Sequence, residues 1–517
     1  MQTNKTFKYW QWRVIICSMI SYAMFYFVRK NMSFALPSLE AEYGITKASF
    51  GAIMTVGGLI YGASKFINGN LADRLNARWH LILGLVLCVL SSVLFGYSDE
   101  LSIIFTGSTS GAGFIRGFIA AMSVLYIINQ IFQGCGFAPC NRLMVNWVPP
   151  KELATKMSIW NTSHSIGAGI LAVLCGVILA NMGADMSLDP ETFKNVADNL
   201  IPEDKASIFW TKLSELNLIG ADGTITSENL VNIKSALPSI EASDPELHKS
   251  LSNIFNYTSH MGAWRWCFWI PAAIAGLGVI FSFITLRDTP KSVGLPELPK
   301  VKGEIDEKDN EDPKAYKRFL MERVFKNPVI WVLAITDLFV YIVRFAILDW
   351  GPSILKDMGL SSNMTGWTVA IFEIAGCAGM ICAGYVADKF FKSRSQRVCA
   401  IEMGLVALCL VALHFLQDAN MPVLFLITLA IAGFLVYGPQ ALVGVTAANV
   451  ATKKAASTAV GLIGFMSYLS TIITGVVFGA IADHCGWSWL FITMGALSVV
   501  GTVFLISIWS IKEGSGE

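Results

Sequence analysis

Two short stretches of this chain repeat each other at one fixed offset, and each places an arginine inside an apolar segment. Tyr26-Phe27-Val28-Arg29 recurs as Tyr341-Ile342-Val343-Arg344, and 344 − 29 = 315. A second pair keeps the same shift, because Gly69-x-x-x-Asp73-Arg74 recurs as Gly384-x-x-x-Asp388-Lys389, and 384 − 69 = 315. Matched motifs of this kind indicate two copies of one ancestral unit. The chain is therefore expected to fold as two related halves.

The apolar content of the chain indicates an integral membrane protein. Hydrophobic residues make up 54% and charged residues 15%, whereas about a quarter of the residues in a soluble domain are charged. The first apolar stretch carries Arg29 and Lys30 and runs too long for a cleaved signal peptide, so we interpret it as a retained span. Helices of roughly 20 residues or more cross a bilayer, and the sequence predicts twelve of them, at residues 12–38, 48–71, 79–98, 117–147, 153–181, 262–287, 328–355, 364–388, 397–417, 421–449, 454–482 and 487–511.

The loops divide these spans into domains and give them an orientation. Lysine and arginine gather in alternate short loops, which predicts that these loops and both termini are cytoplasmic. The predicted fold class is an all-α membrane protein of two six-helix bundles. Its expected parts are helices 1–5 of the N-terminal bundle (1–181), a polar extracytoplasmic insert (182–261), helix 6 (262–287), a cytoplasmic linker (288–327) and the C-terminal bundle (328–517).

The two repeated arginines are the strongest candidates for a binding site. A guanidinium near a bilayer centre costs roughly 2.5 to 3.5 kcal/mol, so such a residue usually faces an interior pathway. Its planar fork of donors matches phosphate oxygens, and tyrosines share its helical face at Tyr22, Tyr26 and Tyr341. The alternative is that Arg29 pairs structurally with a buried carboxylate such as Glu373 or Asp349, or snorkels to the interface.

Three further polar residues lie inside predicted spans. Lys65 follows Tyr61 on one face of the second span, where it either binds a ligand or snorkels to the helix end. His164 and Asn161 lie in the fifth span, and histidine changes charge near neutral pH, so His164 is a candidate for matching the charge of a bound phosphate. The alternative is a histidine satisfied by a neighbouring helix.

The repeated Gly-x-x-x-Asp motifs end spans two and eight on the predicted cytoplasmic side. We expect Asp73, Arg74, Asp388 and Lys389 to form a conformational gate, in which each aspartate caps or pairs with a helix end of the other half. No Gly-x-x-x-x-Gly-Lys-Ser/Thr motif is present to bind ATP, and no catalytic constellation is recognisable, so the protein is not expected to be an enzyme. The eleven cysteines show no metal-binding spacing. No metal, cofactor or nucleic-acid partner is expected.

Several motifs together resemble the organophosphate:phosphate antiporters of the major facilitator superfamily, over nearly the whole chain outside residues 182–261. The stretches that carry the resemblance are Tyr26-Phe27-Val28-Arg29-Lys30-Asn31, Tyr61-Gly62-Ala63-Ser64-Lys65-Phe66, Ile159-Trp160-Asn161-Thr162-Ser163-His164, Arg287-Asp288-Thr289-Pro290, Tyr341-Ile342-Val343-Arg344 and Tyr437-Gly438-Pro439-Gln440. The resemblance implies that Arg29 and Arg344 clamp a phosphoryl group. It implies that the site is lined by Lys65, His164, Asn161, Tyr22, Tyr26, Tyr61, Tyr341, Tyr437 and Tyr468, with Glu373 as an interior partner.

The function implied is a secondary transporter that exchanges a sugar phosphate for inorganic phosphate by alternating access. Hexose 6-phosphate is the first choice, and glycerol 3-phosphate is the alternative. Span eleven carries apolar residues near Ala459 and Leu462, where some hexose-phosphate carriers have an aspartate and a lysine. Two alternative functions remain from other classes of protein. One is a transporter-like sugar-phosphate sensor, and the other is a proton-coupled drug or nutrient transporter. The expected setting is a monomer in a bacterial inner membrane.

Overall fold

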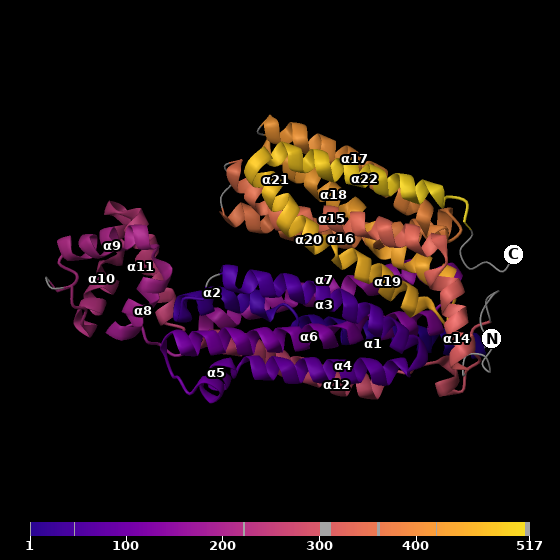
Figure 1. Cartoon of the computed structure of the whole chain (residues 1–517), viewed down its shortest axis with the longest axis horizontal. Coiled ribbons are helices and arrows are strands. Elements are labelled where there is room, and N and C mark those ends of the chain that lie inside the picture. The colour runs from indigo at the N-terminus through magenta and orange to yellow at the C-terminus, as the bar shows by residue number, and fades with distance from the viewer. Residues whose placement is uncertain are drawn as a thin grey trace.

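The computed structural model describes residues 2–45, 47–220, 223–299, 312–358, 362–419 and 421–511. Two helical bundles lie side by side along the long axis of the molecule, and a small helical insert projects from one end (Figure 1). Both chain ends lie at the opposite end (Figure 1). We call these ends the insert side and the termini side. The two-bundle, all-helical fold class predicted from the sequence is confirmed.

The N-terminal bundle is built from α1 (Gln2–Phe27), α2 (Asn31–Tyr43), α3 (Lys47–Arg74), α4 (Ala77–Phe95), α5 (Ser98–Thr106), α6 (Gly111–Trp147), α7 (Pro150–Asn181) and α12 (Ala263–Thr285). The C-terminal bundle is built from α15 (Pro328–Asp357), α16 (Ser362–Phe390), α17 (Ser395–Asp418), α18 (Pro422–Ala451), α19 (Ala456–Tyr468), α20 (Ser470–Ile472), η3 (Ile473–Val477), α21 (Phe478–Cys485) and α22 (Trp487–Ser507). The segment of the chain that connects the two bundles contains η1 (Pro290–Val293), α14 (Pro313–Leu320) and η2 (Met321–Phe325).

Within the described residues, eleven segments are long and apolar enough to cross a bilayer, and α1 with α2 counts as one of them. The remaining predicted span is α3, whose 28 residues also cover a bilayer at about 1.5 Å per residue. Like several of the other spans, it buries polar residues, among them Lys65 and Asn68. Lys65 lies against Phe137 of α6 and Tyr468 of α19. Asn68 contacts Cys135 of α6 and His80 of α4.

Two predicted spans are interrupted rather than continuous. The first, expected over 12–38, ends as α1 at Phe27 and resumes as α2 at Asn31. The Gln133 side chain donates a hydrogen bond of 3.1 Å to the Phe25 carbonyl that the break exposes. The eleventh, expected over 454–482, is divided at Leu469 and passes through the π-helical turn η3. Apolar length alone did not reveal these breaks, because apolar stretches flank each of them on both sides.

The insert has a hydrophobic core of its own. Its helices are α8 (Pro190–Leu200), α9 (Glu203–Glu215), α10 (Ser227–Ser243) and α11 (Pro245–Thr258). They bury Phe193, Leu213, Ile233, Leu251 and Ile254 among themselves. The ends of the insert meet at an antiparallel bridge between Ala184 and Met261, so its removal would leave neighbouring chain ends.

Candidate central binding site

The site lies between the bundles and consists of two neighbouring cavities that share lining residues. The inner cavity has a volume of about 60 Å³ and is lined by residues of both halves, including Lys65, Asn141, Asp337 and Tyr341. The outer cavity is larger, about 930 Å³, and its lining includes Arg29, Glu373 and Arg344. Tyr26, His164, Arg344 and Tyr468 line both cavities. The remaining lining of the outer cavity comes from Lys30 and the start of α2, from Thr471 of α20, and from the insert-side halves of α3, α6, α7, α15 and α16.

Arg29 lies in the break between α1 and α2 and is surrounded by tyrosines. Its guanidinium donates hydrogen bonds to the hydroxyls of Tyr26, at 3.3 Å, and Tyr468, at 2.9 Å. It also lies 3.8 Å from the ring centroid of Tyr61. Among the residues whose side chains are described, no carboxylate lies within 4 Å of it. The structural alternative for Arg29 therefore has no support from Glu373, and the Asp349 side chain lies outside the described residues.

Arg344 occupies the matched position but has a different environment. It lies in the middle of the unbroken helix α15, and its Nη2 is 3.3 Å from Glu373 Oε1 on α16. The ring of Tyr437 packs against it, with the guanidinium carbon 4.6 Å from the ring centroid. The buried Nε has no hydrogen-bond partner within the described part of the chain. The Arg344 Nε–H group therefore remains available to donate a hydrogen bond beside the cavity.

Lys65 reaches the inner cavity from α3. Its ammonium lies 4.4 Å from the ring centroid of Phe137 and 5.7 Å from that of Tyr468. Gly464 on α19 makes room for it, because a Cβ atom at that glycine would lie 2.8 Å from Lys65 Nζ. The lysine is 7% exposed. The structure thus directs this cation into the cavity and not toward a helix end.

His164, Ser165 and Glu373 form a chain of polar contacts that leads to Arg344. His164 Nδ1 donates to the Asn161 carbonyl, and its Nε2 lies 3.2 Å from the Ser165 hydroxyl. That hydroxyl also lies 3.1 Å from Glu373 Oε2. A serine has a single proton to donate. Both contacts of Ser165 are satisfied at once only when His164 Nε2 carries a proton, so this chain links the charge of His164 to the carboxylate that pairs with Arg344.

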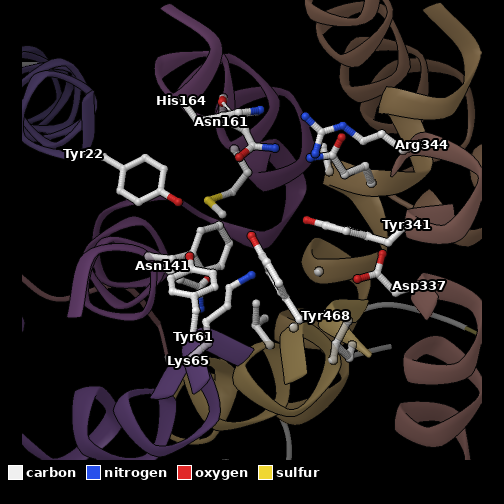
Figure 2. Close-up of a pocket in the computed structure, with 18 of the residues that line it drawn as sticks. Tyr22, Tyr61, Lys65, Asn141, Asn161, His164, Asp337, Tyr341, Arg344 and Tyr468 are labelled. Atoms are coloured by element: carbon white, nitrogen blue, oxygen red, sulfur yellow. Dashed lines mark hydrogen bonds between the residues drawn. The ribbon is translucent and has the colours of Figure 1, made fainter. Parts of the chain in front are cut away.

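The other predicted tyrosines and Asn161 also lie at the site. Tyr22 stacks on Trp160, with ring centroids 4.8 Å apart, and lines the inner cavity. Figure 2 shows Tyr22, Tyr61, Asn161, Tyr341 and Tyr468 around one space. The Asn161 amide lies 3.1 Å from Met380 Sδ in the other half. Of the predicted lining residues, Tyr437 is fully buried and contributes by packing against Arg344.

One residue of the site was missed by the sequence analysis, namely Asp337 on α15. It lines the inner cavity, and Figure 2 shows its carboxylate near Tyr341 and Tyr468. A signal was present, because Asp337, Tyr341 and Arg344 are spaced on one helical face. The offset of the repeat also pairs Asp337 with Tyr22, since 337 − 22 = 315. The mismatch of residue types hid this correspondence.

The predicted gate residues lie at the termini side. Asp73 accepts hydrogen bonds from the backbone and hydroxyl of Thr458, at 2.7 and 2.8 Å, at the start of α19. Asp388 accepts hydrogen bonds from the backbone and hydroxyl of Thr155, at 2.8 and 2.6 Å, near the start of α7. Asp73 therefore binds the first turn of a helix in the other half, where exposed N–H groups favour an anion. Asp388 binds the second turn of α7, close to that helix's N-terminus.

The glycines of the same motifs allow the helices to approach. A Cβ atom at Gly69 would lie 2.4 Å from the Ser457 carbonyl oxygen, and one at Gly384 would lie 2.8 Å from that of Ala154. Both contacts join the two halves. The motif thus combines a close helix contact with an aspartate cap one turn later.

The basic members of the two motifs do not act alike. The Arg74 guanidinium lies over the ring of Tyr316 in α14, 4.4 Å from its centroid. Lys389 is exposed and contacts Tyr385 of its own helix. An arginine that was not predicted, Arg142, lies 3.8 Å from Asp73 and donates to the Lys453 carbonyl. Lys389 does not reach the other half in this structure.

Two helical bundles around a central cavity are the architecture of a membrane transporter. The major facilitator superfamily profile matches residues 18–187 and 251–475. The chain belongs to this superfamily. The solved structure of the superfamily transporter FucP in the outward conformation aligns with a TM-score of 0.61 at 14% identity, covering 97% of this chain and 100% of that one.

The curated relatives include organophosphate transporters. A glycerol-3-phosphate transporter of Bacillus subtilis is 30% identical over 96% of this chain and 92% of its own length. A probable hexose phosphate transport protein of Chlamydia trachomatis is 28% identical over 99% of this chain and 94% of its own length. The resemblance inferred from the motifs is confirmed.

Proposed function

We propose that this protein exchanges a phosphate monoester with a hydroxylated organic part, a sugar phosphate or glycerol phosphate, for inorganic phosphate. The observation that carries the proposal is that Arg29 and Arg344, one from each half, line a common cavity. A phosphoryl group that accepts hydrogen bonds from both joins the halves through its oxygens. Relatives that are named as transporters of both ester types support the substrate class.

The charges of the site explain why exchange would be obligatory. Arg29, Lys30, Lys65 and Arg344 bring four positive charges to the cavities, and Glu373 and Asp337 bring two negative charges. In the empty site the Arg29 guanidinium donates hydrogen bonds to neutral tyrosine hydroxyls. Closing the bundles around this uncompensated charge is therefore unfavourable. A bound dianion supplies the missing charge in both halves. The loaded carrier therefore changes between its two open conformations more easily than the empty carrier does.

The proposed gate explains how one side stays closed while the other is open. Asp73 and Asp388 cap helices of the opposite half on the termini side, while the outer cavity extends toward the insert side. Rocking of the bundles would break both caps together. We also propose that the termini side is cytoplasmic, as the lysine and arginine distribution indicates, and that the carrier works as a monomer in a bacterial inner membrane.

Counterflow in proteoliposomes tests this function. Vesicles loaded with inorganic phosphate should take up labelled phosphate, and external hexose 6-phosphate or glycerol 3-phosphate should compete and drive phosphate release. Vesicles without internal phosphate should show little uptake. Binding of an ester without any flux would instead favour the sensor alternative, and absence of both would contradict the proposal.

A further inference from the structure

Asp337 is a buried carboxylate at the site, and the proposed binding of the phosphoryl group gives it no role. It lies on α15, one turn before Tyr341 and two turns before Arg344, and is 5% exposed. Helical spacing places the three residues on one face of α15. That face lines the cavities, so the carboxylate lies on the inner side of the arginine site.

The acceptor capacity of Asp337 is only partly used. Ser467 on α19 donates a hydrogen bond to its Oδ2. The other oxygen, Oδ1, is buried and has no hydrogen-bond partner in the described part of the chain. Lys65 acts on Asp337 electrostatically from the opposite half, but its ammonium lies over aromatic rings. Buried polar atoms are normally hydrogen-bonded, so Oδ1 is prepared for a donor that arrives with the ligand.

The chemistry of that donor follows from charge and space. A carboxylate repels the phosphoryl oxygens of the ligand, which are drawn to the arginines. The inner cavity holds about 60 Å³, and about 10 to 15 Å³ of such space accommodates one water-sized group. Space for a few hydroxyl-sized groups is therefore present beside an unused carboxylate oxygen.

We propose that Asp337 is a specificity-determining residue that accepts hydrogen bonds from hydroxyl groups of the organic part of the ester. The ester then lies with its phosphoryl group at the arginines and its hydroxylated carbons in the inner cavity. Inorganic phosphate gains nothing from Asp337, because it has no such carbons. This inference rests on the proposed function and adds the orientation of the ligand and the basis of its selection.

The test measures the binding of three ligands to the purified full-length protein: glycerol 3-phosphate, propyl phosphate and inorganic phosphate. The variant is Asp337→Asn, which keeps the shape of the side chain and removes its charge. We expect the affinity ratio of glycerol 3-phosphate to inorganic phosphate to fall at least tenfold, because hydroxyl binding weakens and anion repulsion is relieved. The ratio of propyl phosphate to inorganic phosphate should stay within about threefold.

Two further variants separate this role from folding. Ser467→Ala leaves Asp337 in place without its anchor and should lower the same ratio to a smaller extent. Glu402→Gln is the matched control, because Glu402 is a buried carboxylate of α17 in the same half that lines neither cavity. It should leave the ratio unchanged.

Two outcomes overturn the inference. Equal losses for all three ligands in Asp337→Asn would show a general structural role, and an unchanged ratio would show that the hydroxyls bind elsewhere. If the unmodified protein binds none of the three ligands, the proposed function fails and the inference fails with it. If the unmodified protein binds them but its selectivity does not depend on Asp337, the inference alone fails.

Discussion

The Arg29 guanidinium of the N-terminal half donates a hydrogen bond of 2.9 Å to the Tyr468 hydroxyl of the C-terminal half. This contact crosses the interface where the inner and outer cavities meet, because Tyr468 lines both of them. A phosphate oxygen is a stronger acceptor than a neutral hydroxyl, since charge-assisted hydrogen bonds are about twice as strong as neutral ones. We therefore interpret the contact as one that a ligand replaces.

The aspartate caps at the termini side lead to a first prediction. Asp73→Ala should expose the Ser457 and Thr458 amides in α19, and Asp388→Ala should expose the Thr155 amide in α7. Hydrogen bonds to charged groups contribute about 1.5 to 3 kcal/mol, so amide exchange should accelerate about tenfold or more. Hydrogen–deuterium exchange of the purified variants measures the effect.

The matched control for the caps is Lys389→Ala, because Lys389 is exposed and contacts its own helix. It should leave exchange unchanged at both sites. If the Thr458 amide in Asp73→Ala exchanges at the unmodified rate, the cross-bundle cap does not hold the termini side closed.

A second prediction concerns His164. Protonation of its Nε2 completes the contacts of Ser165 with His164 and Glu373. An unperturbed histidine and the second phosphate ionisation both titrate between about pH 5.5 and 8. His164→Gln should therefore flatten the pH dependence of phosphate exchange over that range. His80→Gln is the control, because His80 is a buried histidine that bonds Asn68 away from the cavities. A slower variant with an unchanged pH profile would assign His164 to packing.

The insert provides a third prediction. No predicted phosphate ligand lies in it, and its ends meet at the bridge between Ala184 and Met261. A chain in which a short Gly/Ser linker joins these two residues should insert in the membrane and retain phosphate counterflow. Counterflow near zero in a correctly inserted carrier would show that the insert takes part in exchange.

The stability of the insert should depend on pH through Asp244. The Lys212 ammonium and the Leu247 backbone N–H donate to this carboxylate and hold its pKa below its usual range. A depressed pKa means that the stabilisation is present above the unfolded value of about 4 and is lost as the pH falls through the folded value. Protection of α11 amides should thus decrease below about pH 4. Asp244→Ala should lack this step, and an identical decrease in the variant would contradict the assignment.

The two-bundle fold and the equivalent positions of the repeated arginines could be predicted, because both follow from patterns that are visible in the sequence itself. Apolar length identifies spans, and a fixed offset identifies equivalent positions such as Arg29 and Arg344. Contacts between the halves were harder to predict from the sequence. Asp337 was missed because its repeat partner is Tyr22, and the contact of Arg142 with the Lys453 carbonyl depends on which helices meet across the interface. The break before α2, which positions Arg29, was not predicted because apolar stretches flank it on both sides.

The central claim is that Arg29 and Arg344 together bind the phosphoryl group through their planar donors. Lysine keeps the charge and loses the fork, so each lysine variant tests geometry and not charge alone. A loss of one charge-assisted hydrogen bond corresponds to roughly a tenfold to hundredfold weaker affinity. The matched control is Arg116→Lys, because Arg116 is exposed on α6 and bonds its own helix.

The most direct measurement is phosphate binding to purified Arg29→Lys, Arg344→Lys and Arg116→Lys proteins that elute as well-folded monomers. The account predicts a loss of at least about tenfold in both site variants and affinity close to that of the unmodified protein for Arg116→Lys. Phosphate affinity close to that of the unmodified protein in either Arg29→Lys or Arg344→Lys would contradict the two-arginine clamp.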